Sequence, residues 1–202
     1  MKKILVLLFG LCVSITAFGQ YDSWGDVPER AQQEFIQKMK QNSPQTLTSD
    51  FYLIRSDFGE PNTKSILYNQ TQGKLYYQTP GILRLEATAS TFITDFDKST
   101  RPYFNSNTFK ILLSVIDASI YQDEKNFEVS IQYWPSMNEW RVQLTPKRKS
   151  YAKEIELIEI YFTQDLLNIE FITLHEYRYD TDINFENQIS NQPLDNKLFN
   201  VE

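Results

Sequence analysis

The residue of this 202-residue chain with the clearest capacity for acid–base chemistry is its single histidine, His175. It stands beside Glu176, late in a strand-like segment. A serine hydrolase needs an imidazole oriented by a carboxylate and close to a nucleophile, and no G-x-S-x-G elbow marks a nucleophile here. We therefore interpret His175 as a strand histidine hydrogen-bonded at the surface. A hydrolase that uses His175 stays open as one of three hypotheses.

The acidic residues offer two other chemistries. The pairs Asp95/Asp97 and Asp180/Asp182 resemble neither a calcium loop nor a His/Cys zinc set, and we predict that both support turns. A glycosidase would need two opposed carboxylates, for which Glu154, Glu156 and Glu159 are candidates. Their spacing on a strand instead predicts solvent-facing charges that discourage edge pairing. We expect no catalytic residue, metal or cofactor, and hence no enzyme.

Phosphate and nucleic-acid chemistry are poorly supported. Past the N-terminal twenty residues the chain has four glycines (Gly25, Gly59, Gly73 and Gly81), too scattered for a phosphate-binding loop. The formal net charge is −6, which disfavours nucleic acid and anionic membranes. The exception is a basic group, which we interpret as a solvated loop, with a docking role as the alternative: Lys147, Arg148, Lys149 and Lys153.

The N-terminus has the pattern of a secretory leader. Lys2 and Lys3 precede an apolar stretch at 4–18, and Ala17-Phe18-Gly19 suits cleavage before Gln20. We expect residues 1–19 to be a cleaved signal peptide and residues 20–202 to form one exported, periplasmic domain. Cleavage would remove Cys12, the only cysteine, and shift the net charge from −6 to −8, because two of the 20 Lys and Arg residues are lost.

Most of the domain alternates apolar and polar residues, which predicts strands with one dry and one wet face. Phe127, Val129, Ile131 and Tyr133, for example, alternate with polar residues. Short turns between such segments predict an antiparallel sheet. The expected strand segments are 51–54, 75–77, 83–87, 92–96, 127–133, 140–145, 155–163, 167–177 and 181–187.

Helices are expected at three places. The first begins with a capping box of Asp26 and Glu29 around Pro28 and ends near Asn42; its apolar stripe is Val27, Ala31, Phe35 and Met39. A short third helix or a loop is expected at 146–151.

The second helix follows Ser106 and is apolar nearly all round, with Phe109, Leu112, Leu113 and Ile116 on one side and Ile111 and Val115 on the other. Such a helix is buried on both sides, either in a solid core or as a lid over a hollow. The 14 Phe, 12 Tyr and 3 Trp residues suit either interpretation.

The order of short motifs along the chain resembles the periplasmic outer-membrane lipoprotein carriers, the LolA-like family, from about Phe35 to Phe199. The matching motifs are Ser49-Asp50-Phe51, Gly73-Lys74-Leu75-Tyr76-Tyr77, Pro80, Leu83-Arg84-Leu85-Glu86, Ser106-Asn107-Thr108-Phe109-Lys110, Trp140, Leu144-Thr145-Pro146-Lys147, Glu176, Asp180, Asp182, Asn184-Phe185, Asn187 and Leu198-Phe199.

The resemblance implies an incomplete antiparallel barrel with helices over its open side. Together with the strand pattern, this gives a mainly-β or α+β fold: an open antiparallel β-barrel of about ten strands, with two or three helices covering the concave face. The expected acyl cavity and lid comprise Phe35, Met39, Phe51, Leu53, Leu75, Tyr77, Leu83, Leu85, Phe92, Phe109, Leu112, Leu113, Ile116, Trp140, Val142 and Phe162.

The function implied is that of a monomeric periplasmic carrier, which shelters lipoprotein acyl chains between the inner and outer membranes. The implied partners are acylated lipoproteins, an inner-membrane lipoprotein-releasing transporter and an outer-membrane acceptor, with no nucleic acid. Two departures from the family pattern stand out: Thr79 replaces a common arginine that is thought to tie the lid, and Tyr179 replaces a glycine. Arg84 is present, but on the face opposite Leu83 and Leu85. The alternative is a divergent binding module that carries or senses another lipid or glycolipid.

Overall fold

The fold is seen in a computed structural model that describes residues 23–57, 66–79, 82–87, 106–166, 168–177 and 179–199. The expected leader, the strand at 92–96 with Asp95 and Asp97, Phe92, and the side chain of Phe109 lie outside the described part. In chain order the elements are β1 (Gly25–Asp26), α1 (Glu29–Asn42), β2 (Thr46–Asp57), β3 (Ile66–Gln78), β4 (Ile82–Ala87), α2 (Ser106–Ile116), the 3-10 helix η2 (Ile120–Gln122), β5 (Phe127–Trp134), β6 (Glu139–Pro146), α3 (Lys149–Ala152), β7 (Ile155–Phe162), β8 (Ile169–Glu176), β9 (Tyr179–Ser190) and the 3-10 helix η3 (Asn196–Phe199).

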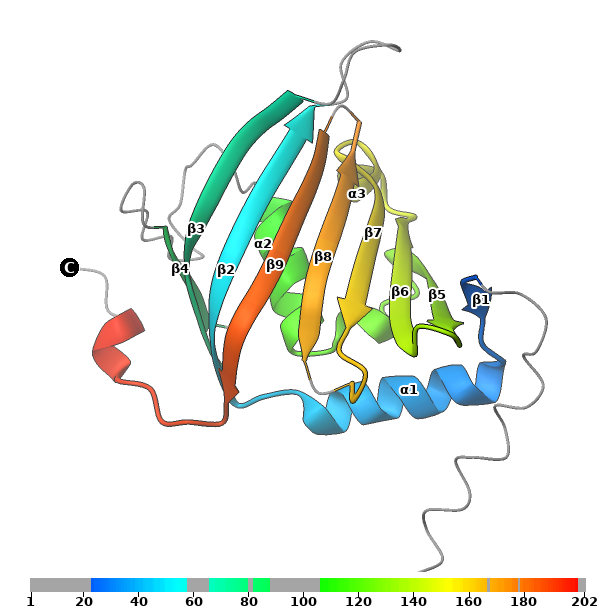
Figure 1. The fold of residues 1–202 in the computed structure, drawn as a ribbon, viewed down its shortest axis with the longest axis horizontal. Helices are drawn as coiled ribbons and strands as arrows, with labels where there is room; N and C mark the ends of the chain where they lie inside the picture. Colours follow the sequence, from blue (N-terminus) through cyan, green and yellow to red (C-terminus); the bar gives the residue numbers. More distant parts are fainter. Residues whose placement is uncertain are drawn as a thin grey trace, which may run out of the picture.

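The nine described strands form one antiparallel sheet in the order β1-β5-β6-β7-β8-β9-β2-β3-β4. β1 and β4 stand at its two ends and do not pair with each other, so the sheet is not closed. Figure 1 shows the sheet curving around α2, while α1 runs across one end of the strands. The prediction of an open, mainly-β barrel with a helical cover is confirmed.

Irregular pairing accompanies the curvature. The β2–β9 register shifts between Thr48 and Asp50, so Asn187 and Gln188 form a bulge in β9 opposite Ser49. The buried Ser49 hydroxyl lies 2.9 Å from the Glu186 carbonyl, and Asn187, whose φ is 51°, donates to Asp50 at 2.8 Å. Bulges bend a strand and increase its twist. The motif residues Ser49, Asp50 and Asn187 therefore meet at one bend of the sheet.

The first helix begins differently from the prediction. α1 starts at Glu29 with Pro28 as its N-cap residue and without a side-chain cap, so the predicted capping box is wrong. Asp26 instead belongs to β1, where its carboxylate accepts hydrogen bonds from Ser130 at 2.8 Å and Gln132 at 3.1 Å. Pairing of β1 with β5 directs this side chain away from the helix start.

The hydrophobic core lies between the concave face of the sheet and the helices. On one side the core is formed by the inward-facing side chains of the strands, and on the other side by apolar side chains of α1, α2 and η2. Among the most buried of these residues are Leu53, Leu75, Tyr77, Leu83, Ile111, Leu112, Ile120, Tyr121, Ile131, Leu144, Ile158, Ile160, Ile172 and Ile183.

Candidate ligand-binding site

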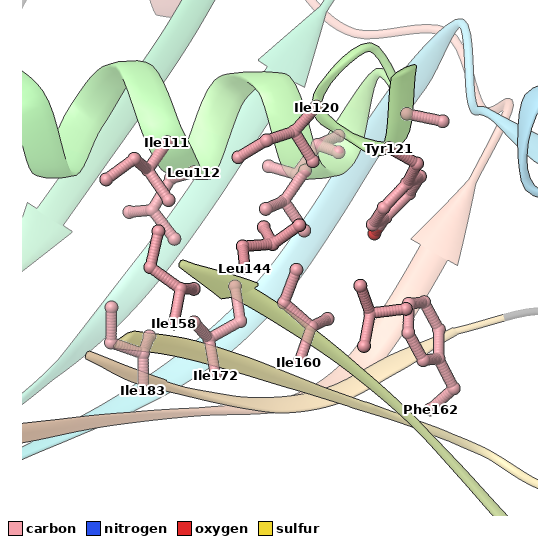
Figure 2. Close-up of a cluster of buried hydrophobic side chains, with 14 of the residues drawn as sticks. Ile111, Leu112, Ile120, Tyr121, Leu144, Ile158, Ile160, Phe162, Ile172 and Ile183 are labelled. Carbon is pink, nitrogen blue, oxygen red and sulfur yellow. The ribbon is translucent and has the colours of Figure 1, made fainter. Parts of the chain in front are cut away.

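The helix α2 and η2 form an apolar layer that faces the concave side of the sheet. Figure 2 shows Ile111 and Leu112 of α2 pointing toward Ile158, Ile172 and Ile183 of β7, β8 and β9. All five side chains are at most 1% exposed. The interface between α2 and the sheet is thus made here by aliphatic groups, which contribute non-directional burial energy.

The burial of α2 differs in detail from the predicted stripe. Leu112 and Ile116 are buried as expected, but Ile111 and Val115 are buried with them, whereas Leu113 is only partly buried. The helix is therefore enclosed on more than one side, as an all-round apolar helix requires.

The C-terminal end of α2 is tied to the end of α1. The Ser43 hydroxyl lies 3.3 Å from the Ile116 carbonyl, and Lys40 donates to the side chain of Gln122 in η2. Ala118 follows the helix with a φ of 60°, a conformation that costs a non-glycine residue energy. This end of α2 is held by directional polar contacts, whereas Ile111 and Leu112 contact the sheet through aliphatic groups.

A pocket lies at this tied end, between α1, the end of α2 and the ends of β7 and β9. It offers about 40 Å³ to the centres of water molecules, room for about three waters. Its walls are Met39, Asn42, Ser43, Pro44, Leu47, Val115, Ile116, Ala118, Tyr121, Phe162, Leu166, Asn168, Ile169, Gln188 and Ser190. A hydrocarbon tail does not fit in this pocket, and the facing side chains Ile111, Leu112, Ile158, Ile172 and Ile183 are packed closely enough to be at most 1% exposed.

Most predicted cavity residues come together in this interior. Phe51, Leu53, Leu75, Tyr77, Leu83, Leu85, Val142 and Phe162 are buried on the concave face, and Phe35 and Met39 approach it from α1. Trp140 is partly buried and stacks on Phe35, with ring centroids 5.4 Å apart. Only Met39, Ile116 and Phe162 of the predicted set also line the 40 Å³ pocket.

Sequence reasoning predicted the central strands but left their inward-facing residues, apart from Phe162, and the whole of η2 out of the expected site. The chain carries apolar residues at both parities in β7, so alternation alone could not show that Ile158 and Ile160 point inward. Tyr121 lies in η2, a three-residue element too short to show a period. Asn42 and Ser43 were taken only as the end of the first helix, although both line the pocket.

His175 is the centre of a polar network on the convex face. Its Nδ1 atom lies 2.8 Å from Asp180 Oδ1 and its Nε2 atom 3.1 Å from Glu159 Oε2. Glu159 also accepts from Arg141 at 2.9 Å and from Gln143 at 2.8 Å. The prediction of a hydrogen-bonded strand histidine is confirmed, and the network lies on the side of the sheet away from α2.

Two interpretations of acidic residues need correction. Glu154 and Glu156 are exposed as predicted, but Glu159 does not face open solvent, because β7 lies inside the sheet between β6 and β8, and its side chain is 13% exposed. Asp180 and Asp182 do not form a turn, because β9 begins at Tyr179 and aligns them with β8. Asp182 accepts from Thr173 at 2.7 Å. In the described part of the chain, no cluster of His, Cys, Asp and Glu is arranged to hold a metal ion.

A second ion pair faces inward at the other end of the concave face. Arg55 Nη2 lies 3.1 Å from Glu176 Oε2, which also accepts from Thr181 at 2.9 Å. The Arg55 guanidinium lies 4.2 Å from the centroid of the Tyr179 ring, so the tyrosine that replaces the family's glycine packs under this arginine. Burial of both charged side chains makes this pair a fixed part of the interior wall.

Arg84 and the basic group lie outside the core. Arg84, on the face opposite Leu83 and Leu85 as predicted, pairs with Glu86 at 2.6 Å and donates to the Leu198 carbonyl of η3. The basic residues beside α3 are exposed, consistent with a solvated surface. No helix among the described residues is long and apolar enough to cross a membrane.

Comparisons with known proteins place this fold among several solved structures. No family model and no curated protein matches the sequence. A DUF1329 family protein from Desulfovibrio piger aligns over 87% of this chain and 98% of its own, with 12% identity and a TM-score of 0.41. A LolA superfamily protein from Nitrosomonas europaea aligns over 82% and 97%, with 8% identity and a TM-score of 0.32. A putative outer membrane lipoprotein-sorting protein domain from Vibrio parahaemolyticus aligns over 83% and 95%, with 9% identity and a TM-score of 0.34.

One of these structures is thus described as a LolA superfamily protein, and another as a putative outer membrane lipoprotein-sorting protein domain. At these identities the likeness concerns the fold and assigns no ligand or residue role. The function proposed below rests on the contacts within this chain.

Proposed function

We propose that this protein is a periplasmic carrier that shelters the acyl chains of lipoproteins between the concave face of its sheet and α2. The carrier would take lipoproteins from an inner-membrane transporter and deliver them to an outer-membrane acceptor. The single observation that carries the proposal is the apolar interface of α2 with β7, β8 and β9 (Figure 2).

This interface suits exchange with hydrocarbon. Ile111 and Leu112 meet Ile158, Ile172 and Ile183 without a directional contact among these five side chains. An acyl chain inserted between the two layers would restore the same kind of burial on both sides. The separation of α2 from the sheet therefore costs little net burial energy when a chain takes its place.

The magnitude of the required shelter is known from transfer energies. Each buried methylene contributes about 0.8 kcal/mol, so a sixteen-carbon chain prefers an apolar site over water by about 12 kcal/mol. A carrier that offered much less would lose its cargo to aggregation. A carrier that held more would not release it. Repacking of α2 on the sheet after release offsets part of the lost contact with the cargo.

The size of the pocket at the end of α2 has a direct consequence for this mechanism. At about 40 Å³ it is too small for an acyl chain, so loading of the interface between α2 and the sheet requires α2 to move. The contacts through Ser43 and Lys40 favour motion about the C-terminal end of α2. No step of this cycle makes or breaks a covalent bond, so we propose a binding protein and not an enzyme.

The direct experiment is a release assay. Purified protein is incubated with spheroplasts of its own source, and acylated lipoproteins in the supernatant are quantified. A carrier releases them in proportion to its concentration. An absence of release, with an authentic carrier active in the same assay, would contradict the proposal.

Matched variants sharpen the assay. Ile111→Lys places a charge in the interface of α2 with the sheet and should abolish release, whereas Ile189→Lys changes an isoleucine that is 53% exposed and should leave release intact. Native mass spectrometry of protein purified from its periplasm identifies the alternative cargo. A bound mass of a glycolipid, without lipoprotein, would favour the divergent binding module.

A further inference from the structure

Two buried polar atoms of the pocket at the end of α2 have no hydrogen-bonding partner among the described residues. They are the hydroxyl of Tyr121 in η2 and the amide nitrogen Nδ2 of Asn42 at the end of α1. Tyr121 is 2% exposed, and both residues line the pocket. An unsatisfied buried donor costs about 1–3 kcal/mol, so such a pair at one pocket needs an explanation.

The other polar side chains with known contacts in this pocket are already bonded. Ser43 donates to the Ile116 carbonyl at 3.3 Å, and Gln188 donates to the Ile169 carbonyl at 2.7 Å. Among the described residues that line the pocket, Tyr121 and Asn42 are those with a buried side-chain donor that lacks a partner. Figure 2 shows Tyr121 reaching from η2 toward Phe162 of β7, which is a wall of the same pocket.

The surroundings limit the kind of ligand to which these two donors can bind. Phe35 and Phe162 lie against the Tyr121 ring, with centroids at 6.3 Å and 6.1 Å. Burial raises the pKa of Tyr121, so its hydroxyl stays a neutral donor. None of the described residues that line the pocket is charged, so an ionised carboxylate would be buried without a counter-ion, at a high cost.

A matching ligand thus presents a neutral acceptor oxygen attached to hydrocarbon. We propose that this pocket binds the carbonyl oxygen of an ester-linked acyl chain, with the Tyr121 hydroxyl and the Asn42 amide as the two donors. The hydrocarbon then runs from this end along the concave face beneath α2. This inference rests on the proposed carrier function and adds to it the group by which the chain is held in position.

The test compares two ligands that differ only in the carbonyl groups. Binding of 1,2-dioctanoylglycerol and of its diether analogue 1,2-di-O-octylglycerol is measured by titration calorimetry. The full protein should prefer the diester about 5- to 30-fold, the range expected for one or two hydrogen bonds to buried donors. Tyr121→Phe should reduce this preference, as should Asn42→Leu.

Stability separates recognition from a structural role. Because the Tyr121 hydroxyl has no partner among the described residues, Tyr121→Phe should unfold at the same or a higher urea concentration than the unaltered protein. The control variant is Tyr133→Phe, which removes a hydroxyl that donates to Asn138 at 2.8 Å in the β5–β6 turn. It should keep the full diester preference.

The outcomes are distinct. Equal binding of diester and diether by the unaltered protein overturns the inference and leaves the carrier function standing. A preference that Tyr121→Phe and Asn42→Leu both retain also overturns it, since the pocket then holds water only. Binding of neither ligand contradicts the carrier function itself.

Discussion

His175 and Glu159 are hydrogen-bonded across neighbouring strands, with 3.1 Å between the Nε2 atom of the imidazole and the Oε2 atom of the carboxylate. The other ring nitrogen faces Asp180 on β9, so an imidazolium at His175 donates to two carboxylates at once. Burial alone would lower the pKa of His175, but the hydrogen bond to Glu159 and the charge of Asp180 raise it above 6.5. The protonated His175 on β8 thus links Glu159 on β7 to Asp180 on β9 through two charged hydrogen bonds.

The free energy of unfolding should fall as the pH rises above 6.5. A folded-state pKa above the unfolded value of 6.5 means that the stabilisation by His175 is complete below pH 6.5 and is lost as pH rises through the folded pKa. His175→Gln should flatten this dependence. Urea unfolding at several pH values between 6 and 9 measures it. The same slope in both proteins would show that another group is responsible.

The acidic side of the profile has different causes. Burial raises the pKa of Glu159, but hydrogen bonds from Gln143 and His175 and the charge of Arg141 outweigh it, so the net pKa lies below 4.5. Burial raises the pKa of Asp180, and His175 offsets this only in part. The two shifts act in opposite directions on the stability of the folded state, because a lowered carboxyl pKa stabilises the charged folded form and a raised one does not.

Loss of Arg141 should weaken the fold more than loss of an exposed arginine. Its guanidinium contacts Glu159 at 2.9 Å and lies 4.4 Å from the centroid of a Trp24 ring. Arg141→Ala should lower the free energy of unfolding by about 1–3 kcal/mol, because Glu159 keeps its charge in a mostly buried position.

The matched control is Arg30→Ala. Arg30 pairs with Glu34 on α1 at 3.0 Å, but its side chain is 91% exposed. The change should be at most about 0.5 kcal/mol. Equal effects of the two substitutions in urea unfolding would contradict the importance of the convex-face network.

Weakening the contact between α2 and the sheet should lower stability and raise ligand affinity together. Leu112→Ala removes a side chain that is 1% exposed in the empty protein and should lower the free energy of unfolding by about 2–5 kcal/mol. In the ligand-bound protein a flexible acyl chain can fill the space that the leucine side chain vacates, so Leu112→Ala destabilises the bound protein less than the free protein. Each 1.4 kcal/mol of difference tightens apparent binding of a diacylated lipopeptide about tenfold.

Titration calorimetry and urea unfolding of the same preparations test whether ligand affinity rises as the free energy of unfolding falls. Ile189→Ala, at an isoleucine that is 53% exposed, should alter neither quantity. An affinity that falls in parallel with stability would mean that α2 is an ordinary part of the core.

Much of the fold was predictable because most strands alternate apolar and polar residues, β7 excepted, and the sheet is antiparallel. Arg84 was placed on the correct face by alternation alone, and α3, at Lys149–Ala152, overlaps the predicted 146–151 segment but ends one residue beyond it. The convex-face network was not predictable, because Arg141, Glu159 and His175 are brought together by the registers of β6, β7 and β8.

The pocket was beyond sequence reasoning for another reason. Tyr121 and Asn42 are far apart in the sequence, and they line the same pocket only because η2 packs against the end of α1. A buried tyrosine in a sequence looks like any core aromatic. That its hydroxyl has no hydrogen-bonding partner among the described residues is visible only in the structure.

The movement of α2 away from the sheet on loading is the claim that most needs measurement. Spin labels at Lys110→Cys on the exposed side of α2 and at Lys74→Cys on the convex side of β3 report their separation by pulsed electron resonance, in a Cys12→Ser background that leaves no other cysteine. Addition of a diacylated lipopeptide should shift the distribution of distances to longer values by several ångströms. Saturating binding with an unchanged distribution would contradict the carrier mechanism.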